Sequence, residues 1–185
     1  MERAALAIFA VTLLVASTCP AEDEVLHSFN LNGTDGVTPE AGLVVDSGGN
    51  LYGTTAQGGA FGGGTLFRLT PPQFAGPWVE KILHNFSNDG VDGANPYAAL
   101  IFDAAGDNLY GTTVGGSAQG SGVVFTLTPQ LSGAWTERRL RDFNNNGKDG
   151  VAPSSGLVFD IQRNLYGTTA TGGSHGEGTV FEISR

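Results

Sequence analysis

The chain has 185 residues, 29 of them glycine, and a formal net charge of −9. Hydrophobic residues make up 40% and charged residues 15%, which excludes a disordered polyampholyte and leaves enough apolar surface for a core. The negative charge disfavours nucleic acid and anionic lipid as partners, whereas it suits solubility or cation binding.

Residues 1–21 have the features of a secretory signal peptide. Arg3 precedes an apolar run from Ala4 to Ala16, which is too short to span a bilayer, and small residues lead to a cleavage site that we place after Ala21. Two alternatives stay open, namely lipidation of Cys19 and a buried N-terminal helix. We expect an exported protein, secreted or at the cell surface, whose mature chain does not insert into the membrane and has no disulfide.

Residues 22–185 form a predicted repeat domain. The stretch Asn-Leu-Tyr-Gly-Thr-Thr occurs three times, with spacings of 58 and then 56 residues, at Asn50–Thr55, Asn108–Thr113 and Asn164–Thr169. We place the three copies at about 24–71, 78–129 and 135–185.

Each copy contains four short segments rich in Val, Leu, Ile, Phe, Tyr and Thr, separated by Gly, Pro, Asn and Asp. In the first copy they are Val25–Phe29, Leu43–Asp46, Leu51–Thr55 and Thr65–Leu69. The segments that open the other two copies are Val79–Phe86 and Glu137–Phe143. Since no segment after the signal peptide has a helical apolar period, the sequence predicts an all-β chain.

A glycine lies inside the third strand of every copy, at Gly53, Gly111 and Gly167. A strand glycine is unfavourable unless another group must come close, and a phenylalanine recurs on the fourth strand, at Phe67, Phe125 and Phe181. We predict that these residues form one packed layer of the core.

Four-stranded units of this length in tandem are typical of β-propeller blades. The predicted fold is therefore three tandem four-stranded antiparallel blades. Three blades are fewer than closed propellers have. An open arc, a homo-oligomer in which two chains complete a ring, and a longer array all stay open, and we favour an arc completed by association.

The motif Asn-Leu-Tyr-Gly-Thr-Thr, followed by Gly-Gly and by Gly-Thr-Leu-Phe-Arg-Leu-Thr-Pro at Gly64–Pro71, resembles the GloVer tandem repeat. The resemblance covers about residues 24–185. It implies a bacterial exported, surface or extracellular repeat protein with no established biochemical activity.

Between its first two strands every copy has an Asn/Asp-Gly-x-Asp-Gly loop. Ca²⁺ prefers several oxygen ligands, and such loops supply them. The candidate ligands are Asn32, Asp35, Asp89, Asp92, Asn146 and Asp149. The alternative is that these side chains hydrogen-bond their own backbone in tight turns, which is the reading we favour.

Other polar positions give weaker signals. His27 and His84 share a repeat position with Arg141, and we interpret them as surface strand residues. Asp46, Asp103 and Asp160 occupy hairpin turns. We expect Trp78 and Trp135 to pack against a neighbouring blade.

Two functions are compatible with these patterns. The first is a non-enzymatic exported scaffold or binding module for an unknown protein or glycan, with no cofactor other than Ca²⁺. The alternative is an exported glycan-active enzyme that uses carboxylates in a cleft on the rim.

Overall fold

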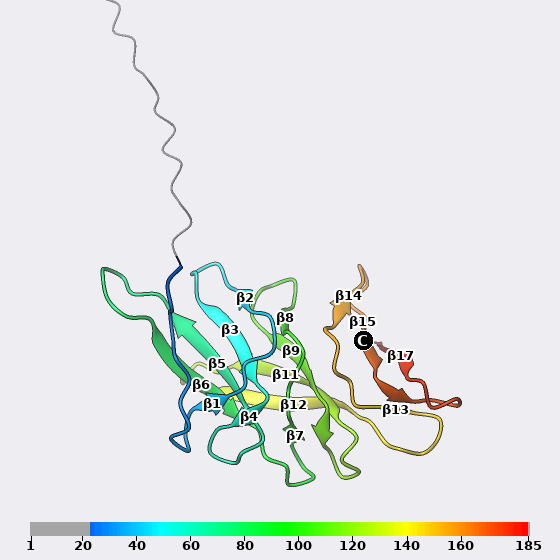
Figure 1. The fold of residues 1–185 in the computed structure, drawn as a ribbon. Coiled ribbons are helices and arrows are strands. Elements are labelled where there is room, and N and C mark those ends of the chain that lie inside the picture. The colour runs from blue at the N-terminus through cyan, green and yellow to red at the C-terminus, as the bar shows by residue number, and fades with distance from the viewer. Residues whose placement is uncertain (1–22, 185) are drawn as a thin grey trace, which may run out of the picture.

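The computed structural model describes residues 23–184, and the predicted signal peptide with Cys19 lies outside them. Every regular element in this part is a β-strand, so the predicted all-β fold is confirmed. No helix among the described residues is long and apolar enough to cross a membrane. The strands form small antiparallel sheets that stand side by side in an open, blade-like arrangement (Figure 1).

We call the three larger sheets blades 1, 2 and 3. Blade 1 has the order β2-β3-β5-β6 and blade 2 the order β12-β11-β9-β8, whereas blade 3 has three strands, β14-β15-β17. The strands of blade 1 are β2 (Val44–Val45), β3 (Leu51–Thr55), β5 (Thr65–Thr70) and β6 (Val79–Asn85). Those of blade 2 are β8 (Ile101–Phe102), β9 (Leu109–Thr113), β11 (Val123–Pro129) and β12 (Trp135–Asp142). Those of blade 3 are β14 (Val158–Phe159), β15 (Leu165–Thr169) and β17 (Thr179–Ile183).

The blades do not coincide with the sequence copies. We predicted that the segments beginning at Val79 and Glu137 open the blades of their own copies, but they form β6 and β12, which pair with β5 and β11 of the preceding copy. The predicted strand Val25–Phe29 forms no strand, because no earlier sheet among the described residues offers it an edge. β6 and β12 thus each belong to one sequence copy and pair with the sheet of the preceding copy, so each links two blades.

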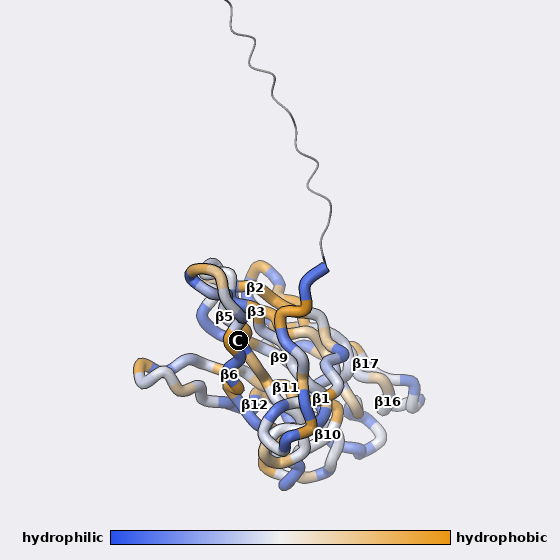
Figure 2. Tube along the Cα trace, turned by 60° about the vertical axis from the view of Figure 1, so that its left-hand side comes forward, coloured by the Kyte–Doolittle hydropathy of each residue, from blue (hydrophilic) through white to orange (hydrophobic). Residues whose placement is uncertain are grey.

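The core lies at the contacts between neighbouring blades. Leu66 of blade 1 packs in one buried cluster with Leu100, Leu109 and Phe125 of blade 2. A second cluster joins blades 2 and 3 and consists of Val124, Phe143, Leu157, Leu165 and Phe181. Hydrophobic stretches accordingly run along the strands around β9 and β11 (Figure 2). A single blade could not exclude water from both of its faces, so the blades stabilise one another.

The glycine in each repeated strand is required for close packing. A Cβ atom at Gly111 would lie 2.6 Å from Cζ of Phe125 and 2.9 Å from Cδ2 of Leu100. Gly53 and Gly167 face the equivalent phenylalanine and leucine at similar distances. The predicted packing of these glycines with the phenylalanines is therefore confirmed. The groups that approach each glycine closely are side chains.

The glycine-rich loops form short ladders that we did not predict. Each loop pairs with the Asn/Asp-Gly loop of its own copy, giving β1 (Gly36–Val37) with β4 (Gln57–Gly58), β7 (Gly93–Ala94) with β10 (Gly115–Gly116), and β13 (Gly150–Val151) with β16 (Thr171–Gly172). At Gly58, φ is +80° and a Cβ atom would lie 2.8 Å from the carbonyl oxygen of Asp35. The ladders place these loops along one rim of the molecule, at the bottom of Figure 1.

Candidate functional site

The first members of the predicted ligand pairs close tight turns. Asn32 Oδ1 accepts hydrogen bonds from the backbone N–H groups of Thr34, at 2.9 Å, and Asp35, at 2.8 Å. Asp89 Oδ1 and Asn146 Oδ1 accept the corresponding bonds in the other two loops. These contacts have the geometry of Asx turns, which a short polar side chain forms without a metal. Calcium binding by the loops stays a prediction.

The second member of each pair is an aspartate whose side chain turns away from its own loop and toward the segment that opens the copy. Oδ2 of each aspartate accepts a backbone N–H five residues earlier, at 3.0 to 3.2 Å, in the pairs Asp35 with Asn30, Asp92 with Ser87 and Asp149 with Asn144. These bonds fix the carboxylate beside the segment that opens the copy. The structure therefore separates each predicted ligand pair into a turn residue and an inward-facing carboxylate.

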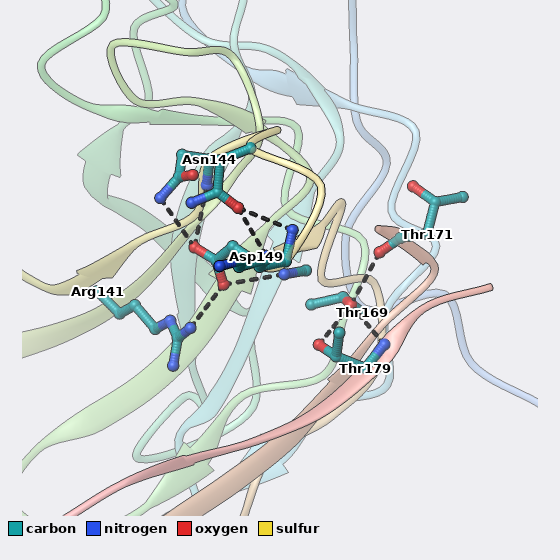
Figure 3. Close-up of polar contacts among 9 residues, drawn as sticks. Arg141, Asn144, Asp149, Thr169, Thr171 and Thr179 are labelled. Carbon is teal, nitrogen blue, oxygen red and sulfur yellow. Dashed lines mark hydrogen bonds and ion pairs between the residues drawn. The ribbon is translucent and has the colours of Figure 1, made fainter. Parts of the chain in front are cut away.

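A basic side chain faces the carboxylate in every copy. His84 Nε2 lies 3.0 Å from Asp92 Oδ2, and an Arg141 guanidinium nitrogen donates to Asp149 Oδ1 at 2.6 Å (Figure 3). In the first copy, His27 takes the same place, 3.6 Å from the carboxylate. His84 and Arg141 thus each place a nitrogen within hydrogen-bond distance of a largely buried acid, whereas His27 lies farther from its aspartate.

The two histidines were predicted to be surface strand residues, but both are largely buried and only His84 lies in a strand, β6. Each imidazole is only 20% exposed. His27 and His84 both pack edge-on against a phenylalanine two residues later, with ring centroids 4.7 Å apart, and Arg141 lies 4.8 Å from the equivalent ring of Phe143. The Arg141 cation beside the aromatic face is favourable, and the alternation of His and Arg at one repeat position was the signal that could have identified the pair.

Threonines support the loop on its other side. In blade 3, Thr169 Oγ1 donates to the carbonyl of Thr171 at 3.0 Å and shares a 2.9 Å hydrogen bond with Thr179 (Figure 3). Thr55 and Thr65 repeat the pair in blade 1. Because these hydroxyls bond one another and the backbone, they serve the fold.

In each of the first two copies, a glutamate from the following copy lies beside the aspartate and the histidine. Glu80 Oε2 lies 3.6 Å from His27 Nε2, and Glu137 occupies the equivalent position in blade 2. One carboxylate oxygen of each glutamate is buried and has no hydrogen-bond partner. We did not predict either residue as part of a site, because only the strand exchange between copies brings it there.

Burial raises the pKa of Glu137 to about 7, and the charge of Asp92 adds to the rise, whereas His84 opposes it. In the unfolded chain a glutamate titrates near pH 4.3. Between these values the native state holds the extra proton, so the free energy of unfolding should fall as the pH rises from about 4 to about 7 and level off above that.

We expect Glu137→Gln to remove this pH dependence. At pH 8 the variant should be more stable than the natural chain by about 1 kcal/mol, a value reduced for solvent screening, and near pH 4.5 the two should match. Urea unfolding in EDTA at both pH values measures the difference. Glu182→Gln is the exposed control and should show no such effect. An equal difference at both pH values would contradict the assignment.

The hairpin aspartates form a separate feature. Asp46 Oδ1 accepts the N–H groups of Gly48 and Asn50, and Oδ2 accepts the amide of Asn50 and the hydroxyl of Tyr52. Asp103 and Asp160 have the same arrangement with their own asparagines. Their predicted place in hairpin turns is confirmed.

A cavity of about 290 Å³ opens between blades 2 and 3, on the side of these hairpins. Its lining includes Asp103, Asp160, Tyr110, Arg138 and Arg163. Burial by itself would raise the pKa of both aspartates, but hydrogen bonds from the neighbouring asparagine and backbone lower it overall. Both side chains are therefore suited to accept hydrogen bonds and not to donate a proton at neutral pH.

Trp135 packs against blade 1, with its ring centroid 6.1 Å from that of Tyr52, which confirms its predicted contact with a neighbouring blade. The contact lies at the junction of blades 1 and 2. The cavity lies at the equivalent junction of blades 2 and 3. The tryptophan at this position is therefore part of the packing between blades.

Comparison with protein families gives a match over almost the whole chain. The family described as the Gloeobacter/Verrucomicrobia repeat matches residues 8–132 and, in a second overlapping region, residues 76–185. Comparison with curated proteins gives no match. Two overlapping matches to one repeat family agree with the tandem copies in the sequence and with the repeated blades of the fold. The chain therefore belongs to the Gloeobacter/Verrucomicrobia repeat family.

Proposed function

We propose that this chain is an exported, non-enzymatic repeat protein that acts as a scaffold or binding module. One observation carries the proposal: the recurring Asn and Asp side chains do the same structural work in successive copies. They close Asx turns at Asn32, Asp89 and Asn146, and they hold the hairpins at Asp46, Asp103 and Asp160. Catalysis generally needs one copy to depart from the others. Export is supported by the sequence of residues 1–21.

The rim that carries the short ladders is the proposed binding surface for a protein or glycan. Loops held on a rigid scaffold commonly carry the binding function of repeat proteins. The ladders β1–β4, β7–β10 and β13–β16 present similar loops three times in a row. A partner with repeated features, such as a polysaccharide, would contact several of them at once.

An exported glycan-active enzyme is the second candidate, because two carboxylates line the cavity between blades 2 and 3. The lowered pKa values of Asp103 and Asp160 weigh against it, since glycoside hydrolysis requires one carboxyl group that stays protonated. A turnover screen on polysaccharides separates the two candidates. Activity that is lost in Asp103→Asn or Asp160→Asn would favour the enzyme.

The two end faces of the array support association with a second copy. Val180 of blade 3 is 79% exposed, although the equivalent Leu66 and Val124 of blades 1 and 2 are fully buried. At the other end Leu43 is 53% exposed, whereas its equivalents Leu100 and Leu157 are buried. Each end thus exposes one half of the contact that joins the blades inside the molecule.

We propose that blade 3 of one copy stacks on blade 1 of another. The contact would repeat the packing of Leu66 on Leu100 and of Val124 on Leu157, and the free edge of β17 would receive the segment Val25–Asn30 of the partner, as β5 receives β6. Such a head-to-tail contact either closes a ring or extends an array. It gives the scaffold a longer binding rim.

Light scattering on the purified protein tests the association. We expect a dimer or larger assembly, and a monomer for Val180→Lys and for Leu43→Lys, because each places a charge in the apolar contact. Ile161→Lys is the matched control, since Ile161 is 94% exposed in the hairpin turn between β14 and β15. A compact natural monomer, or dissociation by the control, would contradict the proposal.

A further inference from the structure

Three ligating side chains meet where the N-terminal segment crosses the edge of blade 1. His27 comes from that segment, Asp35 from the loop before β1, and Glu80 from β6. One ligating atom of each lies within 4.8 Å of the other two. Neither this cluster nor its third member was apparent from the sequence, because Glu80 belongs to the next copy.

The separations are too long for hydrogen bonds and suit a shared ion. His27 Nε2 lies 3.6 Å from Asp35 Oδ2 and 3.6 Å from Glu80 Oε2. A hydrogen bond between such atoms would measure about 2.7–3.2 Å. Two ligands that are each about 2.1 Å from a tetrahedral Zn²⁺ ion are separated by roughly 3.4 Å.

Each of the three side chains has a buried polar atom that makes no hydrogen bond. These are Asp35 Oδ1, His27 Nε2 and Glu80 Oε1. The side chain of Asp35 is only 5% exposed, so water does not readily solvate its free oxygen. Buried polar atoms are nearly always paired, and three orphans in one cluster therefore point to a missing ligand.

The other two copies supply an internal comparison. In the second copy His84 bonds Asp92 directly at 3.0 Å, and Asp92 Oδ1 accepts the N–H of Gly93 at 2.7 Å. In the third copy Asp149 Oδ1 accepts the N–H of Gly150 and a nitrogen of Arg141. Both carboxylates are thus fully engaged by protein atoms. Among the described residues the open arrangement occurs in the first copy alone.

The position of Asp35 is already fixed for binding. Its Oδ2 accepts the backbone N–H and the side-chain amide of Asn30, at 3.0 and 3.1 Å. Hydrogen bonds of this kind orient a metal-bound carboxylate and reduce the cost of ordering it. Oδ2, the oxygen 3.6 Å from His27, thus already accepts two hydrogen bonds, and Oδ1 is the oxygen that is left for an additional ligand.

We propose that His27, Asp35 and Glu80 bind one divalent transition-metal ion, of which Zn²⁺ fits the donor set of one imidazole and two carboxylates best. The ion neutralises the buried acids and occupies the space between them. It also joins residues 25–30, which pair with no strand in the described part of the chain, to β6. The site therefore acts as a staple that holds the N-terminal segment against blade 1.

Calorimetry and thermal unfolding of the EDTA-treated full chain, with Zn²⁺ as the probe, test the proposal. We expect one Zn²⁺ per chain and a higher melting temperature in its presence. His27→Arg copies the residue found in the third copy, so the variant should fold and yet bind Zn²⁺ at least about tenfold more weakly. Glu80→Gln should lose affinity as well.

His84→Arg is the matched control, because it makes the same change where the acid already has its partners. Its affinity for Zn²⁺ should equal that of the natural chain. The proposal is overturned if Zn²⁺ produces neither heat nor a shift in melting temperature, or if His27→Arg and Glu80→Gln bind it as well as His84→Arg does. Should His27→Arg fail to fold, the comparison of Glu80→Gln with His84→Arg decides.

Discussion

Replacing Phe125 by alanine should cost about 3–5 kcal/mol in the free energy of unfolding, the largest effect that we expect from a single substitution. Phe125 is fully buried in β11, at the centre of the array, and its ring centroid lies 5.2 Å from that of Phe86 in an edge-on contact. It belongs to the cluster that joins blades 1 and 2. The cavity left by the ring would be closed in by strands on both sides, so the site cannot collapse around it.

Urea unfolding followed by circular dichroism measures this loss. Domains of this size commonly have only about 5–15 kcal/mol of stability, so the variant should unfold at a much lower urea concentration. Phe74→Ala is the control, because Phe74 is 87% exposed, and it should change stability by less than about 0.5 kcal/mol. A loss below 1 kcal/mol at Phe125 would mean that the blades do not pack as described.

The second large effect should come from adding one methyl group. Gly111→Ala places a Cβ atom 2.6 Å from Phe125 Cζ and 2.9 Å from Leu100 Cδ2, where no atom fits unless the ring or the leucine moves. Neither has free space, since both are buried in the same cluster. Overpacking of this kind costs about 1–3 kcal/mol.

Gly156→Ala is the matched control, because a Cβ atom at Gly156 would meet nothing within 4 Å. We expect it to leave stability nearly unchanged or to raise it slightly by restricting the unfolded chain. Combining Gly111→Ala with Phe125→Leu should cost less than the sum of the two single changes, because the smaller side chain makes room for the methyl group. Strict additivity would show that the glycine and the ring are not in contact.

The close fit of glycine against phenylalanine could be predicted because it repeats. Asn-Leu-Tyr-Gly-Thr-Thr recurs with a phenylalanine at a fixed place on the next strand, and β3, β9 and β15 lie where the motif does. The hairpin aspartates were predictable for the same reason, since Asp46 bonds residues only a few positions away. Local chemistry of this kind needs no knowledge of the fold.

The candidate metal cluster could not be predicted in the same way. The sequence identified Asp35 as a possible ligand, but it paired this residue with Asn32 of the same loop, which closes a turn in the structure. His27 was read as a surface residue, and Glu80 was assigned to a strand without a role. The three meet only because β6 leaves its own copy and pairs with β5.

By itself the sequence determined that the chain is a tandem all-β repeat, where most of its strands lie and which glycines and phenylalanines pack together. These features depend on residues within one copy, whose spacing is constant. The tertiary structure decided which sheet each opening segment joins, which side chains become buried, and where the end faces expose Leu43 and Val180. Segments such as Val79–Asn85 carry the same pattern of side chains whichever edge they pair with. Their partner is therefore chosen by the edge that a neighbouring blade leaves free.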